Sequence, residues 1–363
     1  MPKDAYVAVG DREVRISSPD RVIYEATDRT PEISKLQVCE YFAAVGAGLM
    51  RAVGERPTAL ERWPSGVREG FRLATGPMQK DAEAFYQKRV PKGAPDYLET
   101  VTVTFPSGRT ADEVCPTEAA VPVWCAQMGT LTFHPWPVRR ATGSDRAGDR
   151  PDELRIDLDP QPGTGFADAR RVAGVADELL RELGITGYPK TSGNRGIHIY
   201  VRIRPEWSFE DVRHAAIGFG RELERRDGGV TTAWWKEERG QRIFVDYNQN
   251  NRDRTIASAY SLRPKPGAPV STPLSWAELA GLDDPRELNI ITVPDRLADP
   301  DPWAAIDDVP HDLAPLLKLW EELPGGELNF PPDYPKMPGE PPRVQPSKKV
   351  AGHWDEDGNR TES

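Results

Sequence analysis

Short apolar segments recur along the chain, and several of them alternate apolar and polar residues with a period of two. Such segments are typical of β-strands. They predict strands at 56–64, 98–105, 130–136, 154–159 and 197–203, and a buried strand that ends at Asp246.

Between the expected strands, apolar residues recur three or four positions apart, which is typical of helices. The expected helices are 32–54, with Ser34 as N-cap; 117–129, interrupted at Pro122; 166–183, closed by Gly184; 208–226; and 311–322. Segment 79–91 is expected to be a short basic helix or turn. An alternation of helices and strands of this kind predicts a layered α/β or α+β protein.

Two aspartates end the strand 154–159. Leu154, Ile156 and Leu158 alternate with Arg155, Asp157 and Asp159, so both aspartates lie on the polar face with their side chains close together. Two like charges that close repel each other unless a cation joins them. A third carboxylate, Asp246, ends a later strand. We therefore expect Asp157, Asp159 and Asp246 to form a cradle for two divalent cations, Mg²⁺ or Mn²⁺, which suits phosphoryl transfer.

A glycine-bounded turn, SGNRG (192–196), precedes the strand that carries His198. Its backbone N–H groups, the Ser192 hydroxyl and the Arg195 guanidinium are suited to a polyphosphate. Arg239, Arg263 and Lys265 add positive charge near the third aspartate in sequence.

Each of these features alone has a simpler interpretation. A D-x-D strand end also occurs in haloacid-dehalogenase-type phosphatases and in metal-dependent glycosyltransferases. His198 alone fits a structural histidine, SGNRG alone a tight turn, and Asp246 alone a cap. Their combination, in this order along the chain, is far more specific.

Composition limits the class of protein. The chain has 363 residues, 38% hydrophobic and 29% charged, and contains no apolar run near 18 residues, so no membrane span or membrane partner is expected. The first residues do not follow the pattern of a secretory signal, which predicts a cytoplasmic, nucleoid-associated protein. Cys39, Cys115 and Cys125 lack C-x-x-C spacing and are expected to be ordinary buried thiols.

The net charge of −10 counts against a nucleic-acid partner, because phosphate neutralisation needs a basic surface. The distribution of charge matters more than the sum. Acidic residues concentrate at 278–308 and in the tail, whereas basic residues form local clusters. These clusters are Lys80, Lys88, Arg89 and Lys92; Arg139 and Arg140; Arg202 and Arg204; and Arg252 and Arg254. For any one of them, a solvated face is the simpler interpretation.

A resemblance to a known family is carried by RIDLDP (155–160), KTSGNRGIHIYVRI (190–203), RIFVDYNQNN (242–251) and SAYSLRPKPGAPVSTPLSW (258–276), and upstream by RPTALERWPSGV, FYQKRVPKGAP and FHPW. These segments resemble the polymerase domain of bacterial ligase D and its stand-alone relatives in the archaeo-eukaryotic primase superfamily, over about residues 10 to 300. The resemblance implies an α+β primase-polymerase core, in which an RRM-like β-sheet module packs against a second α/β module with the active site between them.

The resemblance also assigns roles to individual residues. It places Asp157, Asp159 and Asp246 at the metal-binding and catalytic positions. The positions that bind the incoming nucleotide are His134, Ser192, Arg195, His198, Arg239, Gln249 and Arg263. The positions that grip the downstream 5′-phosphate or stack on a base are Phe85, Lys88 and Arg89. Many ligase D domains have lysine where Arg195 stands, which keeps the charge and changes its geometry.

The function implied is that of a DNA-dependent nucleotidyltransferase in bacterial DNA repair by non-homologous end joining, which fills short gaps or extends broken ends with ribonucleotides preferred. Its cofactors would be two divalent cations, Mn²⁺ or Mg²⁺, and its substrates NTPs or dNTPs and gapped or broken duplex DNA with a 5′-phosphate. No K-x-D-G ligase motif is present, so a separate ATP-dependent ligase and an end-binding protein are expected partners. Two alternatives stay open: a bridging factor that recruits a ligase, and a primase that starts chains de novo.

The chain is expected to divide into three parts. Residues 1–300 form the catalytic core and 301–325 a C-terminal helical extension. The tail, 326–363, is rich in proline between 331 and 346 and is expected to be extended or disordered.

Overall fold

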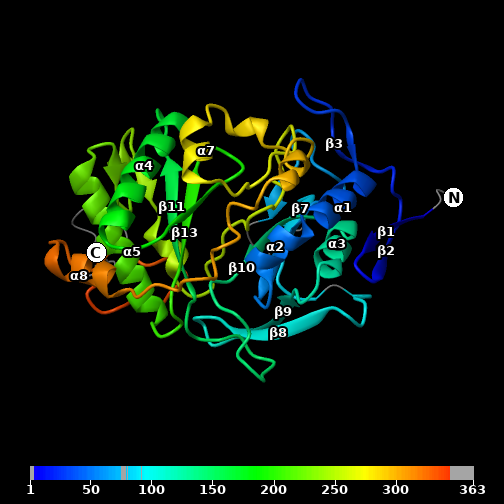
Figure 1. Ribbon diagram of the computed structural model, residues 1–363. Helices are drawn as coiled ribbons and strands as arrows, with labels where there is room; N and C mark the ends of the chain where they lie inside the picture. Colours follow the sequence, from blue (N-terminus) through cyan, green and yellow to red (C-terminus); the bar gives the residue numbers. More distant parts are fainter. Residues whose placement is uncertain (1–3, 75–78, 80, 91, 344–363) are drawn as a thin grey trace, which may run out of the picture.

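The computed structural model describes residues 4–74, 79, 81–90 and 92–343. Two sheet-containing modules lie side by side (Figure 1). The first holds α1, α2 and α3, and the second holds α4 and α5. The predicted α+β class is confirmed.

The first module is built on a six-stranded sheet in which β5 is paired on both sides. Its strands are β5 (Thr58–Arg62), β6 (Leu73–Ala74), β7 (Ala84–Gln87), β8 (Glu99–Thr104), β9 (Thr110–Cys115) and β10 (Thr130–Pro135). The order is β6-β7-β5-β9-β8, and β10 also pairs with β5. Its helices are α1 (Lys35–Ala44), α2 (Gly46–Val53) and α3 (Ala120–Gln127). Two small hairpins precede them: β1 (Ala5–Val9) with β2 (Arg12–Ile16), and β3 (Val22–Tyr24) with β4 (Ile33–Ser34).

The second module is built on a five-stranded sheet in the order β12-β13-β11-β15-β14. Its strands are β11 (Glu153–Pro160), β12 (Tyr188–Thr191), β13 (Ile197–Arg202), β14 (Val230–Thr231) and β15 (Ile243–Val245). Its helices are α4 (Phe166–Glu182), α5 (Phe209–Arg226), α6 (Lys236–Arg239), α7 (Trp276–Gly281) and α8 (Ala314–Glu322), with 3₁₀ turns at Tyr247–Asn250, Pro285–Glu287 and Pro294–Ala298. The apolar face of β11 is buried against α4 and α5.

A crossing segment, residues 256–274, joins the two sheets. On one side Ser258 N donates to Phe133 O of β10 over 2.9 Å. On the other side Thr191 N of β12 donates to Thr272 O over 3.0 Å. A single hydrophobic core includes residues of both modules and of this segment.

Three predictions about local structure are wrong. Segment 79–91 contains the strand β7, because Phe85, Tyr86 and Gln87 pair with β5 and sheet pairing outweighs local preference. The helix expected at 32–54 starts at Lys35 and is split at Val45 into α1 and α2. Pro122 does not interrupt α3, since it is the third residue of the helix, where a backbone N–H has no intrahelical acceptor.

Several other expectations hold. Ser34 caps α1 and accepts a hydrogen bond from Gln37 N. The three cysteines are free and buried, and burial raises the pKa of each thiol to about 12. No helix in the described ranges combines the length and the apolar character needed to cross a membrane.

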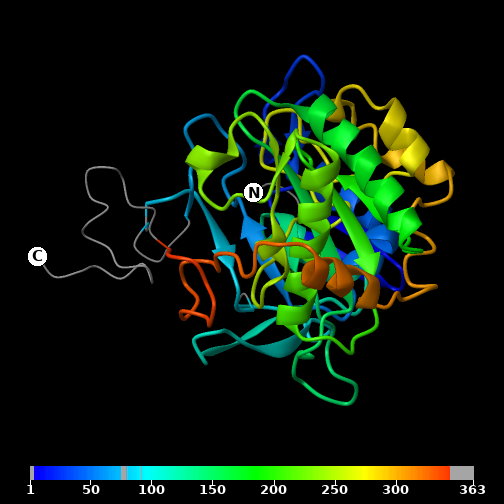
Figure 2. The ribbon, with the colours of Figure 1, turned by 90° about the vertical axis from the view of Figure 1, so that its left-hand side faces the viewer.

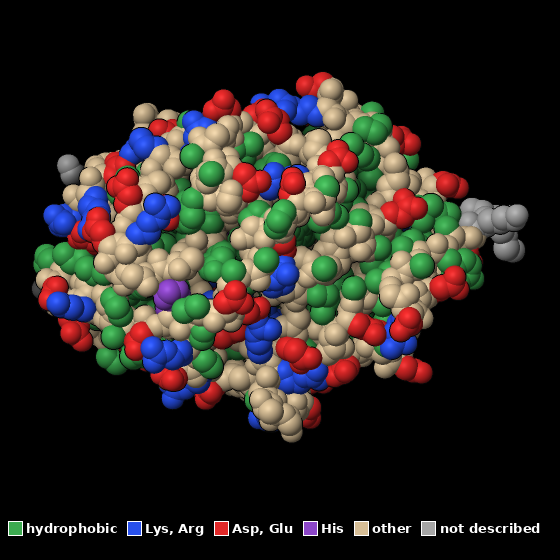
Figure 3. All heavy atoms as spheres, in the orientation of Figure 1, with side chains coloured by type: hydrophobic (Ala, Val, Ile, Leu, Met, Phe, Trp, Pro, Cys, Tyr) green, Lys and Arg blue, Asp and Glu red, His purple; other side chains and the backbone are tan. Residues whose placement is uncertain are grey.

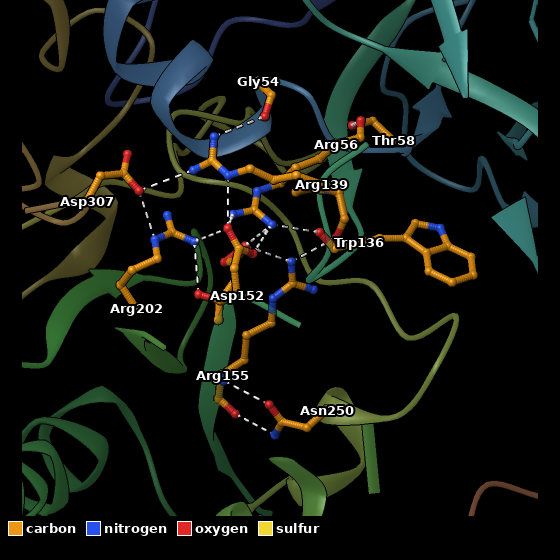
Figure 4. Close-up of polar contacts among 12 residues, drawn as sticks. Gly54, Arg56, Thr58, Trp136, Arg139, Asp152, Arg155, Arg202, Asn250 and Asp307 are labelled. Atoms are coloured by element: carbon orange, nitrogen blue, oxygen red, sulfur yellow. Dashed lines mark hydrogen bonds and ion pairs between the residues drawn. The ribbon is translucent and has the colours of Figure 1, made fainter. Parts of the chain in front are cut away.

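A cluster of arginines surrounds the beginning of β11 (Figure 4). Arg56 donates to both carboxylate oxygens of Asp152, over 2.6 and 2.8 Å. Arg139 and Arg202 reach the same carboxylate over 2.9 and 3.1 Å. Because Arg56 belongs to the first module and Arg202 to the second, Asp152 holds the two modules together at this point.

The chain after α8 packs on the second module as far as it is described. Residues 326–343 contain turns and no helix or strand, and Phe330 is buried. In Figure 2 this stretch, orange to red, lies across the side that faces the viewer. The rest of the proline-rich tail, 344–363, lies outside the described residues, and the three-part division of the chain stays a prediction.

On the face shown in Figure 3, acidic and basic side chains are interspersed. The net charge of −10 therefore does not form one continuous acidic patch on this face.

Candidate active site

Asp157 and Asp159 extend from the polar face of β11. Asp157 lies opposite His198 in the antiparallel pairing of β11 with β13. The Asp157 side chain is 14% exposed, and its Oδ1 lies 3.5 Å from His198 Nε2. Asp159, two residues further on, is exposed. The predicted strand therefore delivers one enclosed and one open carboxylate at the same edge.

Asp246 joins them from the neighbouring strand. β15 pairs with β11 on the side away from β13, and Asp246 N donates to Asp157 O over 3.0 Å. The Asp246 carboxylate accepts hydrogen bonds from Asn248 N and from Gln249 Nε2, each over 3.1 Å. These two bonds fix its orientation, so Gln249 contacts the third carboxylate directly.

Burial and neighbouring carboxylates disfavour the charged forms of Asp157 and Asp246. Burial and the nearby Asp246 and Asp159 raise the pKa of Asp157 well above its usual range. Burial also raises the pKa of Asp246, although its hydrogen bonds and Arg239 oppose that shift. The carboxylate oxygens of the three aspartates are more widely spaced than a preformed metal site requires. Within the described ranges, ligand atoms that all lie within 4.8 Å of one another are found in another group, Glu210, His214 and Glu327. A set of oxygen-only ligands that repel one another fits hard divalent cations, which would neutralise them.

A buried lysine supports His198 from behind. Lys190 on β12 is fully buried, and its Nζ lies 2.8 Å from His198 Nδ1 and 2.5 Å from Ser271 Oγ. Burial and Arg263 lower the pKa of Lys190 well below its usual range. Burial and Lys190 likewise lower the pKa of His198. With Nδ1 engaged by Lys190, His198 directs Nε2 toward Asp157.

The SGNRG turn lies against the end of β11. Ser192 Oγ accepts hydrogen bonds from the N–H groups of Asn194 and Gly196, each over 3.1 Å. These two N–H groups, which were expected to bind an anion, therefore hold the turn together. Arg195 is exposed and donates to Pro160 O over 3.2 Å. Pro160 directly follows Asp159 in the chain, so this bond anchors Arg195 to the end of β11.

Gly193 allows Arg263 to approach this turn. Its φ of +71° is accessible to glycine without strain, and a Cβ there would lie 2.4 Å from Arg263 Cγ. Arg263 also contributes to the electrostatics of Asp157, His198 and His134. It therefore lies between the turn and the first module.

The first module contributes His134. This residue lies on β10, with Nε2 3.0 Å from Glu61 Oε2. The ring of Tyr86 meets the His134 ring edge-on, with centroids 5.3 Å apart, and Tyr86 is 42% exposed. Burial lowers the pKa of His134, while Glu61 opposes that shift.

Arg239 approaches from α6 on the far side of Asp246. Its guanidinium lies 3.5 Å over the ring of Phe244 and donates to Trp234 O over 2.9 Å. Asp246 and Asp159 both influence its charge, so it is a cation of the same cluster.

The residues expected to grip DNA lie elsewhere. Lys88 and Arg89 line a pocket of about 370 Å³ with Phe105 and Arg109, and Lys88 Nζ lies 4.5 Å from the centre of the Phe105 ring. Phe85 is half-buried, and the guanidinium carbon of Arg62 lies 5.3 Å from the centre of the Phe85 ring. On β7, Phe85 and Tyr86 point to opposite faces. Tyr86, rather than Phe85, is the aromatic ring beside His134.

Sequence reasoning missed three residues of this site: Lys190, Glu61 and Tyr86. Lys190 faces His198 across β12 and β13, in register, and the strand before SGNRG could have indicated it. Glu61 and Tyr86 meet His134 through pairings of β5 with β10 and β7, which no local pattern predicts.

Known proteins share this architecture. A family model described as "LigD, primase-polymerase domain" matches residues 34–303. The chain is 31% identical over 287 residues to the multifunctional non-homologous end joining protein LigD of Mycolicibacterium smegmatis, covering 78% of this chain and 34% of the relative. The bifunctional non-homologous end joining protein LigD of Bacillus subtilis is 29% identical over 287 residues, 78% of this chain and 42% of the relative. The chain thus spans well under half the length of these relatives.

A solved structure gives the same result. The polymerase domain of Mycobacterium tuberculosis ligase D, in complex with DNA, matches with a TM-score of 0.70 and 30% identity, over 82% of this chain and 99% of that chain. Almost the whole of that solved domain is therefore matched by this chain. Together with the match over residues 34–303, this similarity shows that the chain belongs to the LigD primase-polymerase domain family.

Proposed function

We propose that this protein is a DNA-dependent nucleotidyltransferase that fills short gaps or extends broken ends during bacterial end-joining repair. One observation carries the proposal: Asp157, Asp159 and Asp246 stand at the ends of the paired strands β11 and β15, with His198 opposite Asp157 and Arg263 packed against the SGNRG turn. Family membership supports it, since relatives of this domain are named for end joining.

In this proposal, Asp157, Asp159 and Asp246 hold divalent cations, Mn²⁺ or Mg²⁺. When bound, such cations would lower the pKa of the attacking 3′-hydroxyl and stabilise the departing pyrophosphate. The chain's own residues position the substrates. Ser192, Arg195, His198 and Arg263 bind the triphosphate, while His134, Arg239 and Gln249 line the nucleotide pocket.

The DNA strand would approach from the first module. Tyr86, exposed beside His134, is suited to stack on a base, and Lys88 and Arg89 in their pocket are suited to contact phosphate. The preference for ribonucleotides, a separate ligase and an end-binding partner belong to the same proposal.

A primer-extension assay tests it. The substrate is a gapped duplex with a 5′-phosphate on the downstream strand, supplied with NTPs or dNTPs and with Mn²⁺ or Mg²⁺. We expect template-directed extension into the gap, faster with NTPs, and more on the phosphorylated than on the unphosphorylated duplex. Duplex binding without extension under all four conditions would favour the bridging-factor alternative instead.

A further inference from the structure

A second group of metal-ligating side chains lies away from the aspartates, where the C-terminal segment crosses α5. Glu210 and His214 are four residues apart in the first turns of α5 and share one face of that helix. Glu327 approaches them from the segment after α8. One ligand atom from each lies within 4.8 Å of the other two, and His214 Nε2 lies 2.8 Å from Glu327 Oε2.

Neighbouring side chains hold two of these three ligands in place. Arg213 donates to Glu327 Oε1, which leaves Oε2 facing His214. The His214 ring stacks on Trp320 of α8, with centroids 4.2 Å apart and planes 6° apart. Metal sites depend on such partners, which orient a ligand without binding the ion.

The third ligand is not engaged by another side chain in the described part of the chain. Glu210 is exposed, and within the described ranges it has no hydrogen-bond or ion-pair partner, so its carboxylate is available.

We propose that Glu210, His214 and Glu327 form a second metal site, selective for a zinc-type transition-metal ion, that fastens the C-terminal segment to α5. One imidazole nitrogen and two carboxylate oxygens suit zinc, whereas the all-oxygen aspartates suit Mg²⁺ or Mn²⁺. Binding replaces the hydrogen bond between His214 Nε2 and Glu327 with two metal–ligand bonds and leaves a fourth position to water.

This site is connected to the candidate active site. Arg213, fully buried, donates to Asn248 Oδ1 over 3.0 Å and to Leu328 O over 2.8 Å. Asn248 in turn donates through its backbone to Asp246 over 3.1 Å and through its side chain to Asn329 O over 2.9 Å. Fixing Glu327 therefore stabilises the segment on which the support of Asp246 rests.

The test uses the full, untagged chain after chelation, with Zn²⁺ as the probe. In a background of Asp157→Ala and Asp159→Ala, which removes two ligands of the aspartate cluster, we expect one Zn²⁺ to bind by calorimetry. At a hundredfold excess over the Kd, the Tm should rise by at least about 2 °C. Co²⁺ should give the intense visible absorption of a tetrahedral complex.

Glu210→Gln is the decisive variant, because Glu210 has no hydrogen-bond or ion-pair partner within the described ranges and glutamine keeps its size. We expect its Tm without metal to match that of the parent, and its Kd for Zn²⁺ to rise on the order of tenfold or more. Glu321→Gln, an exposed acid on α8, is the matched control and should change neither value.

Two results would overturn the site: no Zn²⁺ binding in the aspartate-deficient background, or equal Kd values for Glu210→Gln and Glu321→Gln. These measurements record metal binding and stability without any polymerase assay. They therefore stand or fall separately from the proposed function.

Discussion

The acidic side chains at the two ends of β11 have pKa values shifted in opposite directions. Immediately before the first residue of this strand, Asp152 is surrounded by Arg56, Arg139 and Arg202. Burial alone would raise the pKa of Asp152, but Arg56 and Arg202 outweigh burial and hold it below its usual range. At its end, burial and two other carboxylates raise the pKa of Asp157.

The difference separates a structural acid from a functional one. A carboxylate whose charge is fully compensated contributes to the fold and has no need of a ligand. A group of carboxylates that destabilise one another is retained where something else binds them. The start of this strand thus holds the modules together, and its other end carries the proposed cation site.

The largest effect should come from the functional end. Asp157→Ala together with Asp159→Ala should reduce extension of a gapped duplex at least about a thousandfold, because the cation ligands are lost. Unfolding without metal should occur at the same or a higher denaturant concentration, since a repulsion is removed. Extension kinetics and equilibrium denaturation measure the two effects, and gel-shift binding of the duplex should be almost unchanged. Extension at the wild-type rate would contradict the assignment of these residues.

At the structural end, the expected effect is on stability. Asp152→Ala leaves Arg56, fully buried, without its bidentate partner, and should lower the free energy of unfolding by about 3 to 5 kcal/mol. Lys318→Ala, which removes an exposed ion pair with Glu322, is the control and should cost about 1 kcal/mol or less. Denaturant titration compares them. Equal losses would mean that the cluster around Asp152 is no more than a set of surface ion pairs.

A buried carboxylate away from both ends of β11 separates burial from the influence of neighbours. Glu113 accepts a hydrogen bond from Trp136 Nε1 over 3.1 Å, and burial raises its pKa to about 8. A raised pKa means that the folded state binds the proton more tightly than the unfolded state. The contribution of the protonated Glu113 to the free energy of unfolding is therefore fully present below about pH 4 and is lost as the pH rises toward 8.

Glu113→Gln should remove that loss. The variant should match the wild type near pH 4.5 and be more stable by about 1 to 4 kcal/mol above pH 8, as measured by denaturation across this range. Asp112→Asn, at the exposed neighbouring position, should show no such dependence. A constant difference at every pH would show that Glu113 is already ionised in the folded protein.

The smallest effect concerns the exposed cation at the functional end. Arg195→Ala should raise the KM for nucleotide on the order of tenfold, the contribution of one charge-assisted contact, while Arg195→Lys should retain most activity. Ribonucleotide preference should survive both changes. Arg150→Ala removes another exposed arginine that donates to a single backbone carbonyl, and should leave KM unchanged. Steady-state kinetics with NTPs and dNTPs provide the test, and an unchanged KM in Arg195→Ala would remove Arg195 from the proposed phosphate site.

Local pattern was enough to predict the functional end of β11. The alternation of residues 154–159 predicts that Asp157 and Asp159 share a face, and the order of elements places Asp246 on a neighbouring strand. The shared face follows from the period of two, which a sequence displays directly. The grouping of Asp246 with the other two aspartates comes from the combination of carboxylates and from the family resemblance, not from periodicity.

The structural end could not be predicted in this way. Arg56, Arg139 and Arg202 reach Asp152 from three separate segments, and only the packing of the modules brings them together. The strand β7 was missed for the same reason, because its pairing with β5 is not encoded locally. The proximity of Tyr86 to His134 depends on the same pairing and was missed with it.

The crossing segment 256–274 has a consequence for how the protein can be divided. Its backbone bonds to β10 on one side and to β12 on the other, so it is shared by both sheets. Cutting the gene in the loop 141–151 would separate β10 from this segment and leave Phe133 O without the N–H of Ser258. The two modules therefore cannot be exchanged independently between relatives. A chimera would need a segment 256–274 that matches both β10 and β12.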